Sequence, residues 1–142
     1  IKDKIECVAI VNPMTEEIMT ASKGRGVQFG DRRVRAEVVP LNSAVCAIET
    51  NKVELLSKWQ EASAGLRMSG CGLQGFVDLA AGRVNIALAD NLNDADLASA
   101  MLLAQEAGAL TGDVNGKPVK MNKGELMAAA PKLFKQLMPL GR

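Results

Sequence analysis

The sequence predicts an α/β fold, a layered sandwich in which a mixed sheet is flanked by helices. Three observations predict it: β-rich runs separated by turns in the first thirty residues, alternating strand-like and helix-like segments from residue 43 onward, and one helical segment that is apolar on most sides. The 142 residues suffice for a single domain, 1–142, and no repeat or linker interrupts them.

The first thirty residues are expected to form an antiparallel meander. Residues 5–11 are apolar and β-rich and stop at Asn12-Pro13, a turn signal. A second strand is expected over residues 17–22, and the Lys23-Gly24-Arg25-Gly26 turn joins it to a third strand over 27–30.

Strands and helices are expected to alternate after the meander. Strands are expected over residues 43–49, 66–69, 84–90 and 126–130. Helices are expected over residues 70–81 and 94–107. A further helix, capped by Thr50 or Asn51, should run to residue 64, and a last one should begin at Pro131. Residues 114–117 read as a hairpin turn. The helix over 94–107 is so apolar that we expect it to lie between two layers.

Composition excludes several classes of function. The chain has 17 basic and 16 acidic residues, so its net charge of +1 provides no electrostatic footprint for nucleic acid or an anionic membrane. No apolar run reaches the roughly 18 residues of a membrane span. Three cysteines without C-x-x-C spacing predict neither a disulfide framework nor a thiolate metal cage, and they favour the reducing cytoplasm.

The chain contains no histidine, which removes Ser-His-Asp and Cys-His catalysis and zinc sites that use imidazole. Any chemistry must come from carboxylates, lysines, hydroxyls or a hard metal ion. The strand ending at Asp90 and the helix opening with Asp94 and Asp96 place carboxylates close together in sequence. Acids in a first helical turn cap N–H groups and interact with the helix dipole, and the alternative is that they hold a cation with oxygen ligands.

Several motifs resemble the C-terminal half of the inositol monophosphatase family of magnesium-dependent, lithium-sensitive phosphatases. The family's V-A-x-G-R segment is similar to residues 79–83, its W-D-x-A-A-x motif to residues 95–100, and its E-A-G-G to residues 106–109. Its T-A-x-K-G-x-G run is similar to residues 20–26, and its late D-x-x-G hairpin to residues 113–117. The similarity covers nearly the whole chain in the same order.

The resemblance implies roles for individual residues. Asp96 takes the place of a metal-binding Asp, while Gly70 and Cys71 fall in the segment that contacts substrate. Gly75 and Ala89 stand where family members carry substrate-binding acids, and Asp90, one position after Ala89, is the remaining candidate for that contact. Strand alternation would point Asp90 to the opposite side.

Two functions follow from the resemblance. In the first, the chain is the C-terminal lobe of a Mg²⁺-dependent phosphomonoesterase for a sugar, inositol or nucleotide phosphate, inactive alone because the family's metal-binding Glu and D-P-[LI]-D-G-T motif belong to an N-terminal half that this sequence lacks. Mg²⁺ would then bind only with that half present. In the second, the chain is a non-catalytic module used for binding or assembly. Either predicts a partner, the N-terminal half or a second copy in a dimer, at an exposed apolar face or sheet edge.

Three weaker candidates remain. The turn over residues 23–26 could cradle a phosphate with backbone N–H groups, although a plain hairpin turn is favoured. The basic cluster over residues 31–35 reads as a solvated sheet edge. Cys71 could be a reactive thiol near a helix start, although a semi-buried thiol is favoured.

Overall fold

The computed structural model describes residues 4–141, which form two sheets and four α-helices. The first sheet contains β1 (Cys7–Asn12), β2 (Glu17–Ser22), β3 (Gly26–Phe29) and β4 (Arg32–Val34). The second sheet and its helices are formed in chain order by β5 (Val45–Glu49), α1 (Val53–Ala62), β6 (Gly65–Arg67), α2 (Gly72–Ala80), β7 (Ile86–Ala89), α3 (Asp94–Glu106), β8 (Leu110–Gly112), β9 (Leu126–Ala129) and α4 (Pro131–Leu137).

The meander predicted for the first thirty residues is confirmed and forms a sheet of its own. Its strands lie in the order β1-β2-β3-β4, all antiparallel, with Val11 opposite Ile18 and Val27 opposite Val34. The basic cluster supplies β4, an edge strand in which Arg32 and Arg33 are exposed. Charged residues on an edge discourage pairing with another chain.

The second sheet is the predicted mixed sheet, with strand order β6-β5-β7-β9-β8. Strands β6, β5 and β7 are parallel, and β9 runs antiparallel to both β7 and β8. The sequence analysis did not predict β8, because three residues, Leu110-Thr111-Gly112, carry no periodic pattern and become a strand only by pairing with β9.

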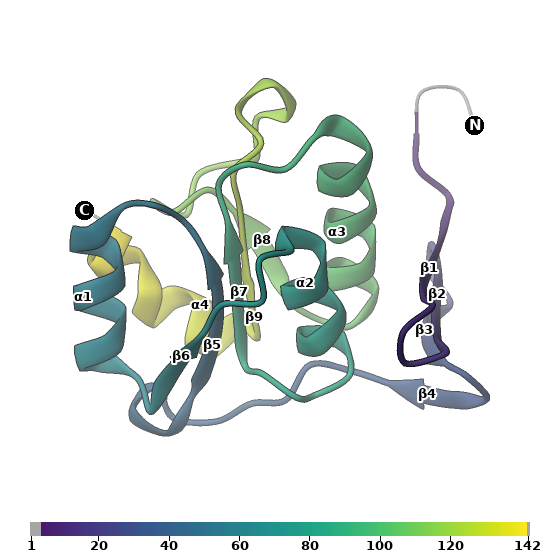
Figure 1. Cartoon of the computed structure of the whole chain (residues 1–142), viewed down its shortest axis with the longest axis horizontal. Helices are drawn as coiled ribbons and strands as arrows, with labels where there is room; N and C mark the ends of the chain where they lie inside the picture. Colours follow the sequence, from purple (N-terminus) through teal and green to yellow (C-terminus); the bar gives the residue numbers. More distant parts are fainter. Residues whose placement is uncertain (1–3, 142) are drawn as a thin grey trace.

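The elements stack in four layers, which Figure 1 shows from the side. Helices α1 and α4 cover one face of the mixed sheet, α2 and α3 cover the other, and the meander sheet packs on the far side of α2 and α3. Helix α3 is therefore covered on both sides, as its apolar sequence predicted. Within residues 4–141, no helix combines the length and the apolar character needed to cross a membrane.

Alternation along the central strands divides the core into two clusters. In β7, Ile86 and Leu88 pack with α1 and α4, whereas Ala87 and Ala89 face α2 and α3. The alanines allow a close approach, because a Cβ added at Gly75 in α2 would lie 3.0 Å from the Cβ of Ala47 in β5. A longer side chain at position 75, such as a substrate-binding acid, would collide with this surface of the sheet. Glycine at this position therefore allows α2 to pack closely on β5.

Helix α1 begins differently from the expectation. Neither Thr50 nor Asn51 caps it, since the N-cap residue is Lys52 and no side chain caps the first turn. The hydroxyl of Thr50 instead donates to Asp90 and accepts the N–H of Lys52 at 3.2 Å. A nearby acceptor therefore overrides the local capping preference of threonine.

Candidate functional site

Polar side chains gather where the parallel strands β5 and β7 end. Glu49 is the last residue of β5 and Thr50 follows it, and Asp90 follows β7 directly. Because the carboxyl ends of parallel strands meet at one edge of a sheet, these side chains lie close together, in the position where α/β sheets bind ligands. A cavity of about 220 Å³ opens there, lined by Glu49, Thr50, Asn51, Met68, Gly70, Gly72, Ala89, Asp90 and Asn91.

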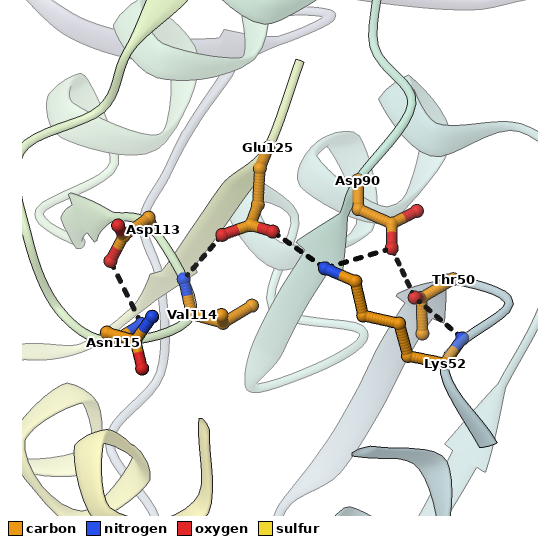
Figure 2. A network of polar contacts seen from close by, with 7 residues as sticks. All are labelled: Thr50, Lys52, Asp90, Asp113, Val114, Asn115 and Glu125. Atoms are coloured by element: carbon orange, nitrogen blue, oxygen red, sulfur yellow. Dashed lines mark hydrogen bonds and ion pairs between the residues drawn. The ribbon is translucent and has the colours of Figure 1, made fainter. Parts of the chain in front are cut away.

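Figure 2 shows the polar network beside this cavity. Lys52 Nζ lies 3.5 Å from Asp90 Oδ2 and 2.9 Å from Glu125 Oε2, and Glu125 Oε1 accepts the N–H of Val114 at 3.1 Å. The hydrogen bond to Glu125 raises the pKa of Lys52, and Asp90 adds to that shift. The Asp90 and Glu125 side chains are only 17% and 15% exposed, so Lys52 supplies the positive charge that their burial requires.

Asp90 and Gly70, both predicted to contact substrate, line the same cavity. The carboxylate of Asp90, however, is bound to Thr50 and Lys52 on the side of the sheet that α1 covers. Strand alternation therefore directs the Asp90 carboxylate as expected, and Asp90 stays a predicted substrate contact at the wall of the cavity. Cys71 lines a different cavity, of about 410 Å³ and mostly apolar, between α2 and the meander sheet.

The loop before α2 is held by a carboxylate that the sequence analysis missed. Glu49 Oε1 accepts the backbone N–H of Gly70 at 2.9 Å, the hydroxyl of Ser69 at 3.1 Å and the N–H of Ser69. Ser69 Oγ in turn accepts the N–H of Cys71 at 3.2 Å. The sequence did contain a signal for this role. Glu49 ends a predicted strand, as Asp90 does, and the position at a strand end was the reason for considering Asp90.

Asp96 forms a reciprocal cap at the start of α3. Asn93 Oδ1 accepts the N–H of Asp96 at 2.8 Å, and Asn93 Nδ2 donates to Asp96 Oδ2 at 2.9 Å. The first bond is the N-cap half of a capping box and satisfies one free N–H group of the helix terminus, whereas the second joins the two side chains. Asp96 is half-buried, and no donor from residues 4–141 reaches its second oxygen, Oδ1. Asp96 therefore does take part in the cap at the start of α3, while its Oδ1 remains available to a further ligand.

The described residues contain no cluster of acidic side chains of the kind that forms a multi-carboxylate metal site. Mg²⁺ requires near-octahedral oxygen geometry. Among residues 4–141, no group of three or more Asp, Glu, His or Cys side chains is arranged to hold a metal ion. A site with three or more such ligands would therefore need side chains from outside these residues.

The turn over residues 23–26 does form a cradle of N–H groups, and a side chain of the same chain fills it. Gly24 and Gly26 each donate a backbone N–H to the Glu106 carboxylate at 2.8 Å. Glu106 ends α3, so this contact ties α3 to the meander sheet. The favoured hairpin interpretation is confirmed, and the N–H groups that could have cradled a phosphate bind Glu106.

Replacing Glu106 by Gln is expected to destabilise the protein by about 1 kcal/mol at pH 7, a value reduced for the side chain's solvent exposure. The N–H of Gly24, followed by those of Gly26 and Arg25, lowers the pKa of Glu106 from its ordinary 4.5. A lowered folded-state pKa means that this stabilisation is full above the ordinary value and is lost as pH falls through the folded-state pKa.

Urea titrations of wild type and Glu106→Gln from pH 7 to pH 3, followed by the fluorescence of Trp59, measure the effect. The difference should shrink on acidification, while the exposed Glu61→Gln variant should match wild type throughout. A Glu106→Gln difference that stays constant to pH 3 would contradict the assignment.

Known proteins are similar to this chain over nearly its whole length. Residues 1–140 match the model of the inositol monophosphatase family. The protein called Nus factor SuhB is 30% identical in Pseudomonas aeruginosa and 27% identical in Escherichia coli K12. The matches cover 96% and 97% of this chain but 55% of each relative, so the chain spans about half the length of these curated relatives.

Solved structures show the same architecture. The extragenic suppressor protein suhB from Bartonella henselae superimposes with a TM-score of 0.91 at 27% identity, covering 98% of this chain and 58% of that one. An inositol monophosphatase from Anabaena superimposes with a TM-score of 0.91 at 17% identity, covering 99% and 60%, which shows the fold alone. The match is to the C-terminal part of these proteins, as the motifs predicted.

Proposed function

The chain belongs to the inositol monophosphatase family, and on that premise we propose that it forms the C-terminal lobe of a Mg²⁺-dependent phosphomonoesterase for a sugar, inositol or nucleotide phosphate. The observation that supports the proposal is the Asp96 side chain at the start of α3, whose Oδ1 accepts no hydrogen bond from residues 4–141, at the position that the motif resemblance assigns to the family's metal-binding Asp. The remaining metal ligands would come from the part of the fold that the relatives have beyond the matched region.

In this proposal the substrate lies against the carboxyl edge of the mixed sheet. Gly70 and Asp90 line the cavity there, and Cys71 lies at the N-cap of α2 on the adjoining loop. The N–H of Gly70 is bound to Glu49 and that of Cys71 to Ser69, so the loop would meet substrate in a fixed conformation. The three free cysteines fit a reducing compartment, and we propose the cytoplasm.

We expect the 142-residue chain alone to show no Mg²⁺-dependent phosphatase activity, because one available carboxylate oxygen cannot organise the metal. Phosphate release is measured from an inositol phosphate, a sugar phosphate and a nucleotide phosphate, with Mg²⁺ and with EDTA. Mg²⁺-dependent turnover that Asp96→Asn abolishes would contradict the need for further ligands.

A second candidate, a non-catalytic module for binding or assembly, is favoured by a separate observation. By the motif resemblance, Gly75 and Ala89 stand where family members carry acids, and Ala95 stands where the W-D-x-A-A-x motif has its Trp. Asp90 is paired with Lys52. The relatives from Pseudomonas aeruginosa and Escherichia coli are named Nus factor SuhB. This candidate predicts that no activity appears even when the remaining part of the fold is supplied.

Both candidates place a partner on the meander sheet. Its edge strand β1, Cys7–Asn12, carries no charged residue. Val11 within β1 is 59% exposed, Ile18 in the neighbouring β2 is 52% exposed, and Met14 between the two strands is 90% exposed. An uncharged edge beside exposed apolar side chains favours pairing with another strand. We propose that the remaining part of the fold, or a second copy when that part is absent, covers this surface.

The chain is therefore expected to sediment as a dimer or larger species at high concentration. Val11→Lys combined with Ile18→Lys should shift it toward the monomer, because the two residues are cross-strand neighbours on this surface. Val38→Lys, which changes a 64% exposed residue outside the sheet, is the matched control. A monomer at all concentrations would contradict the proposed surface.

A further inference from the structure

Glu49 contacts the loop before α2 with a single carboxylate oxygen. Its Oε1 accepts three hydrogen bonds, from the backbone N–H of Ser69, the hydroxyl of Ser69 at 3.1 Å and the N–H of Gly70 at 2.9 Å. The two residues lie 20 and 21 positions from Glu49, so the contact joins the end of β5 to a loop beyond α1 and β6. Bonds to an ionised acceptor are about twice as strong as neutral ones.

The same loop lacks the support that usually fixes a helix start. Cys71 is the N-cap residue of α2, and its side chain accepts no capping hydrogen bond, whereas Ser, Thr, Asp or Asn commonly would. Gly70 has a φ of +78°, a left-handed conformation. Ser69 Oγ accepts the N–H of Cys71 at 3.2 Å, and the Cys71 carbonyl oxygen, 3.1 Å away, competes with Glu49 for its single hydroxyl proton. Ser69 is itself held by Glu49.

The other side of the loop is fixed by packing. A Cβ added at Gly72 would lie 2.7 Å from Leu92 Cδ2 and 3.1 Å from the Cβ of Ala89. The first residue of α2 thus rests directly on the end of β7 and the segment that follows it. Packing thus fixes the start of α2. The hydrogen bonds that Glu49 accepts then fix the backbone of Ser69 and Gly70 between β6 and the helix.

We propose that Glu49 is the positioning residue for the Ser69–Cys71 loop, holding it in the conformation in which it forms a wall of the substrate cavity. Glu49 and Gly70 line that cavity together. The contact between loop and substrate rests on the proposed function, while the action of Glu49 on the loop is independent of it. The carboxylate fixes the loop just before a helix start that no side chain caps.

Amide hydrogen exchange measured by NMR on the whole chain tests this directly. Glu49→Ala should accelerate exchange at Ser69 and Gly70 at least about tenfold and move both amide proton resonances upfield, because their acceptor is removed. Glu49→Gln keeps an acceptor oxygen at the same reach, so it should restore part of the protection. It also keeps the test valid if the alanine variant does not fold.

Two controls distinguish a local effect on the loop from a general destabilisation of the fold. The N–H of Asp90 donates to the backbone carbonyl of Glu49 at 3.2 Å, a bond that the substitutions leave in place, so its exchange should stay unchanged. Glu61→Ala removes an exposed carboxylate of α1 and should leave both loop amides as in wild type. Acceleration below about tenfold at both loop amides in Glu49→Ala, or no difference between Glu49→Ala and Glu49→Gln, overturns the proposal.

The outcome is independent of catalysis. If the amides respond as expected and the completed protein has no phosphatase activity, Glu49 still positions the loop and the proposed function fails. If the completed protein is active and the amides do not respond, the function stands and Glu49 is not the positioning residue.

Discussion

Replacing Gly124 by Ala is expected to destabilise the protein by about 3 kcal/mol or more, through backbone strain and a backbone clash. Gly124 has a φ of +63°, and a Cβ there would lie 2.4 Å from the carbonyl oxygen of Leu92 and 3.1 Å from its nitrogen. These are main-chain atoms, so rotation of a side chain cannot relieve the contact. The Leu92 N–H also donates to the carbonyl of Gly124 at 2.9 Å.

The matched control is Gly108→Ala. Gly108 has a φ of +85°, but a Cβ there would meet no heavy atom within 4 Å, so only the conformational cost of about 1 kcal/mol applies. Urea unfolding followed by the fluorescence of Trp59, which is 1% exposed, measures both variants. Equal costs at the two positions would contradict the close approach at Gly124.

The contact at Gly124 has a consequence for the site. Leu92 lies between Asp90, at the end of β7, and Asp96, in the first turn of α3. Anchoring Leu92 to Gly124, just before β9, therefore sets where α3 starts relative to the carboxyl edge of the sheet. We expect destabilisation at Gly124 to perturb the orientation of both aspartates.

Much of the fold could be predicted from the sequence because its main signals are local. The apolar pattern of residues 94–107 required two covering layers, and α3 has them. Strand β8 is three residues long and exists through pairing with β9, so no local signal marked it as a strand. Strand β4 is equally short, but its basic residues indicated a sheet edge. The predicted cap of α1 was wrong, because the Thr50 hydroxyl donates instead to Asp90, forty residues away.

The candidate site was less predictable, for the same physical reason. Asp96, Gly70 and Cys71 were found through motifs that resemble a family. Lys52 and Glu125 are 73 positions apart, and the chain pattern contains nothing that pairs them before the sheet is assembled. Glu106 looked like part of a helix end, and its role as the occupant of the 23–26 turn depends on the packing of α3 against the meander sheet.

Asp96→Asn should have the largest effect on activity of any change considered. In this chain alone it removes the favourable interaction of a carboxylate with the helix dipole, about 0.3–1 kcal/mol, and the loss should not depend on Mg²⁺. Repulsion between Asp96 and the nearby Asp90 offsets little of this loss, because Lys52 compensates the charge of Asp90. A stability change of this size leaves the variant folded, so activity can be compared directly.

The most direct test joins this chain to the N-terminal part that its relatives have and measures Mg²⁺-dependent phosphate release from the inositol, sugar and nucleotide phosphates. Asp94→Asn is the matched control, since Asp94 is an exposed acid in the same helical turn and takes no part in the Asn93 cap. We expect the joined protein to turn over at least one substrate, Asp96→Asn to lower turnover by at least about a hundredfold, as loss of a metal ligand would, and Asp94→Asn to have little effect. Absence of turnover in the joined protein, or equal effects of the two substitutions, would contradict the assignment of this chain as the lobe that supplies Asp96 to a phosphatase site.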